Sequence, residues 1–545
     1  MGQGVALKRR HFLAASTLPL LGCDKAPAID GGFVGVQHER GHLLRASASP
    51  WPAPLKTQRT RVLIAGGGVA GLAAARALRL RGIHDFTLLE LEDAAGGNSR
   101  GGQVHGVACP LGAHYLPVPG NDAHAVQDLL EELGLRQRVA GRWVYDERHL
   151  CHSPQERLFI DGQWQEGLLP LQGVDAATLA DYRRFARLVR EASNAASFTI
   201  PVSKAALAPA HQALDAMTFE AWLDRQQLTS APLRWYLDYC CRDDYGAGLA
   251  TVSAWAGLHY FASRHGFSAP GAEPSSEREH TVEGGILTWP EGNGWLTQRL
   301  AQPLGERLQT GRVVTRVAAG KHGVELDAIN TRSQTLERWQ ADHCILALPL
   351  FVAARVLDNP PPALREAAAA LRYAPWLVAN LHLKSALHDR PGAAPSWDNV
   401  IYSAGVASTG LGYVDAKHQS LQAVPGATVL THYRAFGIDA AQRKDLYQQP
   451  WTHWRDKVLA ELAVPHPDLP GKVTRIDVMR YGHAMSTPVP GIRSSAALRA
   501  LQGAQPAPWQ RLQFAHSDVS GYSVFEEAFT HGHAAASAFG SKPTR

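Results

Sequence analysis

The sequence lacks the features that mark several large classes of protein. No run of five or six like charges occurs, and the net charge of +5 comes from 54 Lys and Arg against 49 Asp and Glu, spread thinly. This pattern argues against a nucleic-acid-binding surface. After the first two dozen residues, no apolar run approaches the roughly 18 residues of a membrane-spanning helix. Low-complexity tracts and internal repeats are also missing, which argues against fibrous and solenoid folds.

Cysteine is scarce, with six residues among 545 and no Cys-x-x-Cys pair. Their spacing gives no sign of a zinc ribbon, a dithiol redox motif or a covalent haem site. Asp243 and Asp244 likewise lack metal-site spacing, so we expect no bound metal. One or two disulfides stay open as an option, whereas the adjacent Cys240 and Cys241 are expected to serve packing.

The chain has enough apolar residues to build large cores. Its 545 residues are 45% hydrophobic and only 19% charged, which predicts two to four domains. The 50 glycines and 34 prolines are spread along the chain between short segments. This composition is typical of a loop-rich enzyme with short alternating elements.

The N-terminus resembles an export signal. Residues 8–13 read KRRHFL, an apolar stretch of about ten residues follows, and residues 20–23 read LLGC. That stretch is too short to span a bilayer, and the adjacent arginines resemble a twin-arginine signal. The LLGC run resembles a lipobox, in which Cys23 would receive lipid; the alternative is an ordinary secretory signal with an incidental cysteine.

We therefore expect residues 1–23 to form an export signal with a lipobox that directs the chain to the periplasmic side of a bacterial envelope, where Cys23 would become the new N-terminus after cleavage. A lipid on Cys23 would then be the only link to the membrane. Residues 24–58 are rich in Gly, Ala, Ser and Pro, and we expect them to form a tether or a surface loop.

A dinucleotide-binding fingerprint begins at residue 61. Residues 61–71 read RVLIAGGGVAG, a buried-strand pattern that runs into a glycine turn and then a helical pattern. Gly66 is expected to make the tight turn and Gly68 to let the backbone approach a pyrophosphate. Gly71 would allow the helix to pack closely on the strand.

The rest of the fingerprint follows in register. Val69 and Ala70 open the helix, whose N-terminus offers N–H groups and a positive dipole end to phosphates. A second strand pattern, residues 86–90, ends in Glu90, where a carboxylate would accept hydrogen bonds from the adenosine ribose. Strand, turn, helix, strand and acid together predict dinucleotide binding.

Further segments resemble the flavin-containing amine oxidase and phytoene desaturase superfamily. The main ones are residues 92–100 (EDAAGGNSR), 111–116 (LGAHYL) and 512–522 (LQFAHSDVSGY), the last leading into an Ala-rich helical pattern. Weaker matches are 311–317 (GRVVTRV) and 342–349 (DHCILALP). The resemblance implies FAD as cofactor, held without a covalent bond because no cysteine lies in a flavin-linking motif.

The resemblance also implies the fold class, α/β plus α+β. A discontinuous Rossmann-like FAD-binding domain would be interrupted by an inserted substrate-binding domain, with the substrate cleft at their interface. The FAD-binding pieces would be residues 59–120, 281–355 and 471–545. The substrate-binding pieces would be residues 121–280 and 356–470.

Several residues are placed at FAD by this resemblance, beyond the glycine turn and Glu90. They are Gly96, Gly97, Ser99, Arg100, Gly112, Ala113, His114, Val314, Ser517, Asp518 and Gly521. One departure is that the family usually has an acid where this chain aligns Ser517, with Asp518 next to it. Either side chain would contact the ribityl chain or pyrophosphate, or else cap a helix.

The aromatic side chains in front of the flavin depart from the family as well. Amine oxidases commonly place two aromatic residues there, and the aligned places fall near Thr487 and near residues 524–525. Tyr481 and Tyr522 are candidate substitutes, although ordinary core tyrosines are as good an interpretation.

Two further residues are candidates for catalysis. His114 would lie beside the flavin as a base or a substrate contact. The alternative is a structural role without chemistry. Lys417 would be the family lysine that holds a water at flavin N5, or else an ordinary exposed lysine.

The expected function is that of an exported FAD-dependent oxidoreductase. Its substrate would be a small amine, including a polyamine, which loses a hydride to flavin N5. The electron acceptor stays open between oxygen, a quinone and a cytochrome. The alternatives are a desaturase or isomerase of an apolar, carotenoid-like substrate, and a non-catalytic flavin-binding envelope protein. The Gly96-Gly97 doublet and the C-terminal segment disfavour a nicotinamide dehydrogenase.

Overall fold

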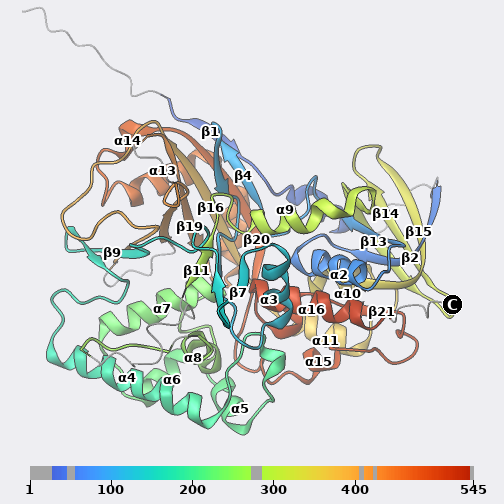
Figure 1. Cartoon of the computed structure of the whole chain (residues 1–545), viewed down its shortest axis with the longest axis horizontal. Coiled ribbons are helices and arrows are strands. Elements are labelled where there is room, and N and C mark those ends of the chain that lie inside the picture. The colour runs from blue at the N-terminus through green and yellow to red at the C-terminus, as the bar shows by residue number, and fades with distance from the viewer. Residues whose placement is uncertain are drawn as a thin grey trace, which may run out of the picture.

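The computed structural model describes residues 28–45, 54, 56–264, 266–271, 285–403, 410–420 and 426–539. The predicted export signal, with Cys23, lies outside these residues. Two lobes lie side by side in Figure 1, each built around one large β-sheet.

The first lobe contains the fingerprint on a seven-stranded sheet. Strands β12, β3, β2, β15 and β21 are parallel to their neighbours, and β14 and β13 extend the sheet in antiparallel fashion. The predicted strands at residues 61 and 86 are confirmed as β2 and β3. The bounds are β12 (Leu308–Thr310), β3 (Phe86–Glu90), β2 (Lys56–Ala65), β15 (Thr335–Leu346), β14 (Val324–Asn330), β13 (Arg312–Ala319) and β21 (Leu512–Phe514).

Helices cover both faces of this sheet because successive side chains of β2 point to opposite faces. Val62 and Ile64 pack in the core under α2, α3, α9 and α16. Leu63 and Ala65 pack in the core under α10, α11 and α15. These helices are α2 (Val69–Leu80), α3 (His124–Glu132), α9 (Gly294–Ala301), α10 (Leu350–Val356), α11 (Pro362–Ala370), α15 (Ala496–Ala500) and α16 (Phe525–Ser537).

The second lobe contains an eight-stranded sheet in the order β1-β20-β16-β19-β18-β17-β9-β10. Its long central strands alternate between two cores, one on each face. The bounds are β1 (Asp30–Phe33), β20 (Val473–Thr487), β16 (Arg372–Leu383), β19 (Thr428–Ala435), β18 (Gly410–Asp415), β17 (Asp398–Ile401), β9 (Glu156–Ile160) and β10 (Gln163–Glu166).

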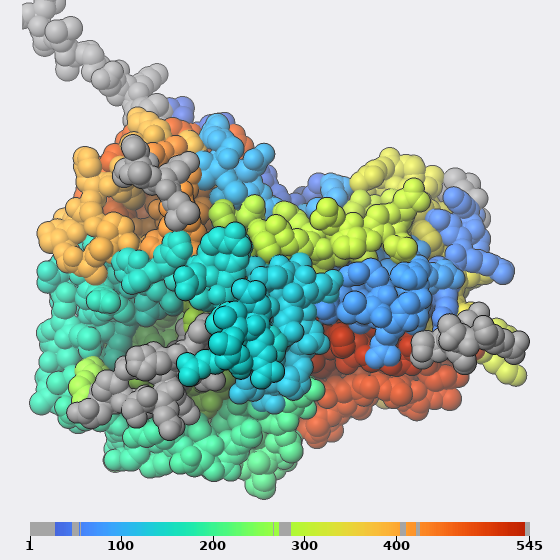
Figure 2. Space-filling view, in the orientation of Figure 1, coloured from blue at the N-terminus to red at the C-terminus, as the bar shows by residue number. Residues whose placement is uncertain are grey.

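Trp376 and Val378 on β16 pack in a core with the helical layer α4–α8, whereas Leu377 and Ala379 pack in a core with helices from α12 to α14. The helical layer is green in Figure 2, below the orange part of the sheet lobe. These helices are α4 (Ala176–Ala195), α5 (Pro209–Asp215), α6 (Phe219–Arg225), α7 (Ala231–Tyr245), α8 (Ala254–Ala262), α12 (Ala440–Gln448), α13 (Trp451–Leu462) and α14 (Leu469–Lys472).

Three short antiparallel pairs complete the fold. The pair β6–β11 joins two segments that are far apart in the sequence. The pairs are β4 (Gly101–Val104) with β5 (Val107–Pro110), β6 (Tyr115–Pro117) with β11 (Ile286–Thr288), and β7 (Arg136–Val139) with β8 (Arg142–Tyr145).

The prediction of a tether or surface loop over residues 24–58 is wrong for its described central part. Strand β1 pairs in parallel with β20, and α1 (His38–His42) and a 3-10 turn (Leu43–Arg45) follow. The guanidinium of Arg40 donates to both carboxylate oxygens of Asp93, at 3.1 and 3.0 Å. The segment is ordered because β1 completes a free sheet edge and Arg40 fastens it to the first lobe.

The boundaries of the two lobes also differ from the predicted ones. Strand β20 pairs with β16 along its length, so residues 473–487 belong to the second sheet rather than to the FAD-binding piece 471–545. Helix α3 packs on α16, and α11 packs on α15. Parts of the segments 121–280 and 356–470 therefore lie in the first lobe, because their apolar faces are buried there.

Within the described ranges, no helix combines the length and apolarity needed to cross a membrane. Cys109, Cys151, Cys240, Cys241 and Cys344 carry free thiols. Cys240 and Cys241 are buried in the core beneath the helical layer, as the packing interpretation predicts.

Candidate FAD and substrate site

The glycine turn between β2 and α2 is built for close approach of backbone to backbone. Gly66 has φ +103°, and a Cβ there would lie 2.3 Å from the carbonyl oxygen of Ala347. A Cβ on Gly71 would lie 1.9 Å from the carbonyl oxygen of Gly66, so only glycine lets α2 start this close to the turn. Gly71 therefore has the packing role predicted for it, and it does not line the cavity.

Gly68 differs from these two glycines because the space beside it is open. The nearest heavy atom to a Cβ on Gly68 would be the Cα of Gly97, at 3.9 Å. Gly68 is the N-cap of α2, and no side chain caps the first turn. The free N–H groups of that turn and the open space fit a pyrophosphate at the helix N-terminus.

Glu90 ends β3 directly beneath this turn. Its carboxylate accepts hydrogen bonds from the backbone N–H of Gly67 at 2.7 Å and of Glu92 at 2.8 Å. Burial raises the pKa of Glu90, while these two backbone hydrogen bonds oppose the rise. The side chain is thus held at the cavity wall, where the ribose role predicted for it requires it to be.

A cavity of about 790 Å³ runs from this turn into the second lobe. This volume lies in the upper part of the range for pockets that bind small molecules and cofactors. Most of the predicted residues line it: Gly66, Gly68, Val69, Ala70, Glu90, Gly96, Gly97, Ser99, Arg100, Gly112, Ala113, His114, Val314, Tyr481, Ser517 and Asp518.

Besides Gly71, two residues predicted to act at the site, Gly521 and Lys417, do not line this cavity. Gly521 has φ +84° at the end of a 3-10 turn, and a Cβ there would lie 2.2 Å from the side chain of Ile492. Its role is therefore packing rather than cofactor contact. Lys417 lies in the turn after β18, where its backbone N–H donates to Asp415 at 3.0 Å. That turn lies outside the cavity wall, so the structure does not support a role at flavin N5.

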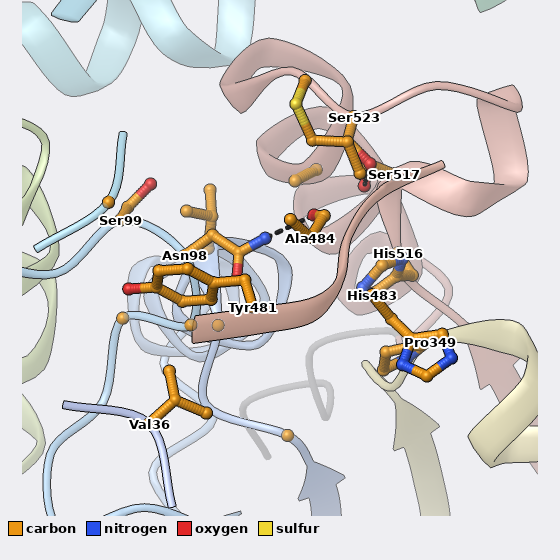
Figure 3. Close-up of a pocket in the computed structure, with 18 of the residues that line it drawn as sticks. Val36, Asn98, Ser99, Pro349, Tyr481, His483, Ala484, His516, Ser517 and Ser523 are labelled. Carbon is orange, nitrogen blue, oxygen red and sulfur yellow. Dashed lines mark hydrogen bonds between the residues drawn. The ribbon is translucent and has the colours of Figure 1, made fainter. Parts of the chain in front are cut away.

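Ser517 and Asp518 both reach the cavity wall, but their side chains are used differently. One carboxylate oxygen of Asp518 accepts hydrogen bonds from the Leu350 N–H at 2.9 Å and the Tyr373 hydroxyl at 2.6 Å. His516 and these hydrogen bonds outweigh burial and lower the pKa of Asp518. Asp518 thus joins β16 to the start of α10, while Ser517 lies near Ser523 (Figure 3) and is the freer candidate for the ribityl chain.

Two tyrosine hydroxyl groups donate hydrogen bonds to the backbone of the segment 111–114. Tyr481 donates its hydroxyl proton to the carbonyl oxygen of Leu111, and Tyr433 donates to that of Gly112 at 2.9 Å. Tyr481 therefore positions backbone through its hydroxyl group, and a direct role in catalysis stays a prediction.

His114 lies among aromatic rings in the wall of the cavity. Its ring stacks on Tyr433, with centroids 4.5 Å apart, and lies 5.3 Å from Trp397. Burial lowers the pKa of His114 to about 3, so the imidazole is neutral at pH 7 and a weak proton acceptor. The structure therefore disfavours a base role for His114, while a substrate contact stays a prediction.

The two places expected to be aromatic are not equivalent in the structure. Thr487 is fully buried and donates to the carbonyl oxygen of Tyr245 at 3.0 Å, away from the cavity wall. Residues 524–525 do line the cavity. Tyr522 does not, because its hydroxyl donates to Glu527 at 2.9 Å. Phe525 is therefore an aromatic residue of the wall, and Trp376 and Tyr433 on neighbouring strands of the second sheet add two more.

Sequence reasoning missed several residues of the wall. Figure 3 shows Val36 from the N-terminal segment, and Asn98 with its amide donating to the carbonyl oxygen of Ala484. His483 and His516 also line the cavity and lie at the other side of the same view. No local pattern marks Val36 or His483, whereas Asn98 and His516 lie within the segments 92–100 and 512–522 without having been singled out there.

Comparison with known proteins agrees with this geometry. Residues 69–538 match the family model of flavin-containing amine oxidoreductases. The chain belongs to this family. The predicted superfamily and fold class are thereby confirmed, and the protein is an FAD-dependent oxidoreductase by class, with FAD as its cofactor.

Individual relatives are distant. The chain is 26% identical to the L-amino acid dehydrogenase of Synechocystis sp. over 309 residues, 56% of this chain and 59% of that protein. It is 25% identical to the flavin-containing amine oxidase B of Bos taurus over 306 residues, 55% of this chain and 52% of that protein. The chain thus spans less than two thirds of either relative.

Among solved structures, a putrescine oxidase with putrescine bound has a TM-score of 0.63 at 17% identity. The match covers 88% of this chain and 99% of that one. This similarity shows a shared fold and, at such low identity, nothing finer.

Proposed function

We propose that this protein oxidises an amine, and that it does so outside the cytoplasm. The observation that carries the proposal is the single cavity that joins the N-terminus of α2 to an aromatic and carboxylate wall in the second lobe. FAD, when bound, accepts the hydride from the carbon next to nitrogen. The amine oxidase B and putrescine oxidase that the chain resembles are named for amines.

The chain's own residues would bind and orient the substrate. Tyr433 and Trp376 offer flat apolar surfaces that hold an amine and exclude water. His114 stays neutral beside them, so it adds no positive charge that would repel an ammonium ion. The hydroxyl groups of Tyr433 and Tyr481 fix the segment 111–114, on which the family resemblance places the flavin ring.

A desaturase or isomerase of an apolar substrate is the second candidate, and the carboxyl groups in the cavity wall disfavour it. Asp243 and Glu526 line the substrate end of the cavity. An apolar chain would leave these carboxyl groups buried without a polar partner, which costs free energy. A flavin carrier without turnover is the third candidate, and the following experiment separates amine oxidation from both alternatives.

The test is the visible spectrum of the purified protein, recorded without oxygen before and after adding putrescine, spermidine and simple monoamines. We expect flavin bands that one or more amines bleach. Flavin bands that no amine bleaches would overturn the amine proposal. Readmitting air, a quinone or a cytochrome then identifies the electron acceptor by the rate at which the colour returns.

The export proposal rests on the sequence alone, on Arg9, Arg10 and Cys23. Replacing both arginines with lysine is expected to leave the protein in the cytoplasm, because twin-arginine transport requires the pair. Cell fractionation measures this, and the mass of the N-terminal peptide shows whether Cys23 carries lipid. Unchanged export of the double variant would contradict the route, and an intact N-terminus on exported protein would contradict cleavage.

A further inference from the structure

Four charged side chains in the cavity wall are grouped around Arg264, which interacts electrostatically with Asp243, Asp244 and Glu526. Helix α7 presents Asp243 and Asp244, the residues just after α8 present Arg264, and the first turn of α16 presents Glu526. Three carboxyl groups therefore meet one guanidinium group in an enclosed space.

Arg264 is already paired. It donates to both carboxylate oxygens of Asp244, at 3.0 and 3.2 Å, and to the carbonyl oxygen of Tyr260 at 3.2 Å. The side chains of Arg264 and Asp244 are 14% and 5% exposed, so this is a largely desolvated ion pair in which one guanidinium nitrogen donates to both carboxylate oxygens. Such a pair leaves Arg264 poorly suited to bind the carboxylate of an amino acid.

The other two carboxyl groups of this cluster, those of Glu526 and Asp243, have no positive partner of their own. Glu526 is only 4% exposed, and its side chain accepts no hydrogen bond from another residue in the described ranges. Within those ranges, Asp243 accepts one long hydrogen bond, from the Tyr115 hydroxyl at 3.4 Å. Two buried or half-buried carboxyl groups thus face the cavity without a positive partner of their own.

The pKa values of both carboxyl groups are raised by this environment. Burial, followed by the negative charge of Asp244, raises the pKa of Asp243 to about 7. Burial also raises the pKa of Glu526 to about 7. The charged or titratable groups around Asp243 are Asp244, Arg264, Tyr115, Glu156, Asp398, Tyr239, Cys240, Tyr260 and Tyr433. Those around Glu526 are Arg264, Glu527 and Asp244. A cation brought into this space would be attracted by ionised carboxylates that little else neutralises.

We infer that Asp243 and Glu526 form a cation subsite that selects an amine carrying a second positive charge, and that disfavours a substrate with an α-carboxylate. This inference rests on the proposed amine oxidation. The second ammonium group would bind the two carboxylates while the reacting amino group lies between the subsite and the flavin. A substrate carboxylate would instead meet like charges, because Asp244 has already neutralised Arg264.

Three compounds that differ by one group each test the subsite. Pentylamine has one amino group, cadaverine adds a second, and L-lysine adds an α-carboxylate to cadaverine. With the FAD-loaded protein, we expect cadaverine to reduce the flavin with a KM at least about tenfold below that of pentylamine and of L-lysine. An equal or better KM for pentylamine or for L-lysine overturns the inference.

Variants assign the effect to the two residues. Asp243→Asn and Glu526→Gln are each expected to raise the KM for cadaverine about 10-fold to 100-fold, with little change for pentylamine. Glu220→Gln removes an exposed carboxylate on α6 and serves as the matched control. If both variants raise the two KM values equally, or raise neither, the residues do not form a cation subsite.

The pH dependence gives a second readout. Because ionised carboxylates bind the cation, the ratio of the pentylamine KM to the cadaverine KM should rise as pH increases from 6 to 8. The ratio largely cancels ionisation of the reacting amino group, which the two compounds share. It should flatten in the double variant, and a ratio that is flat in the unchanged protein overturns the inference. If no amine reduces the flavin at all, the proposed function fails, and the subsite falls with it.

Discussion

Replacing Gly68 with valine is expected to give a folded protein that no longer retains FAD. A Cβ at this position meets no protein atom closer than 3.9 Å, and φ −70° with ψ −174° suits valine. The new methyl groups would fill the space at the N-terminus of α2 where the pyrophosphate is expected. We expect FAD affinity to fall by more than about 100-fold, or about 2.7 kcal/mol.

Flavin absorbance per protein after purification measures the loss, and titration with FAD gives the affinity. Gly120→Ala is the matched control, because its Cβ would enter open space on the surface. Gly71→Val is the contrasting variant, since its Cβ would lie 1.9 Å from the carbonyl oxygen of Gly66 and should damage the fold itself. A Gly68→Val protein that keeps one FAD per chain, or that fails to fold, would contradict this account of Gly68.

Replacing Glu527 with alanine is expected to cost about 3–5 kcal/mol of stability. Glu527 is fully buried on α16 and accepts hydrogen bonds from the Val202 N–H at 2.6 Å, the Tyr522 hydroxyl at 2.9 Å and the Ser520 hydroxyl. Alanine would leave these donors buried without an acceptor. Because Val202 follows α4 in the second lobe, the loss should also loosen the contact between the lobes.

Urea unfolding followed by circular dichroism and by flavin release measures this effect. Glu527→Gln should lose less, because its amide oxygen still accepts hydrogen bonds. Glu366→Ala is the control, since Glu366 is exposed on α11. An alanine variant of Glu527 as stable as the control would mean that solvent or rearranged partners satisfy the three donors.

The flavin end of the cavity could be predicted because its chemistry is local. The turn from β2 into α2 requires glycine at 66 and 71 for steric reasons that a short stretch of sequence states in full. Glu90 follows at the spacing that a strand–helix–strand unit imposes. Residues 96–100 and 111–114 are also continuous segments, so their match to a known family carried over directly to the cavity wall.

The predictions that were wrong used local sequence where the outcome depends on tertiary contacts. Gly521 and Lys417 were assigned from local alignment, yet Gly521 packs on Ile492 and Lys417 lies outside the cavity wall. Strand β1 was missed because its pairing partner, β20, lies more than 400 residues away in the sequence. The boundary near residue 471 was misplaced for a related reason, since only the pairing of β20 with β16 shows to which sheet it belongs.

The sequence by itself determined that this chain binds FAD through a strand–turn–helix unit, because sterics and helix-terminus electrostatics act over a few residues. Tertiary structure alone decided which residues from distant segments line the same cavity as the glycine turn. Asp243 comes from α7, Glu526 from α16 and Tyr433 from β19, and folding brings all three to one cavity. Their burial, their missing partners and the pairing of Arg264 with Asp244 arise from that assembly, and the proposed choice of substrate rests on them.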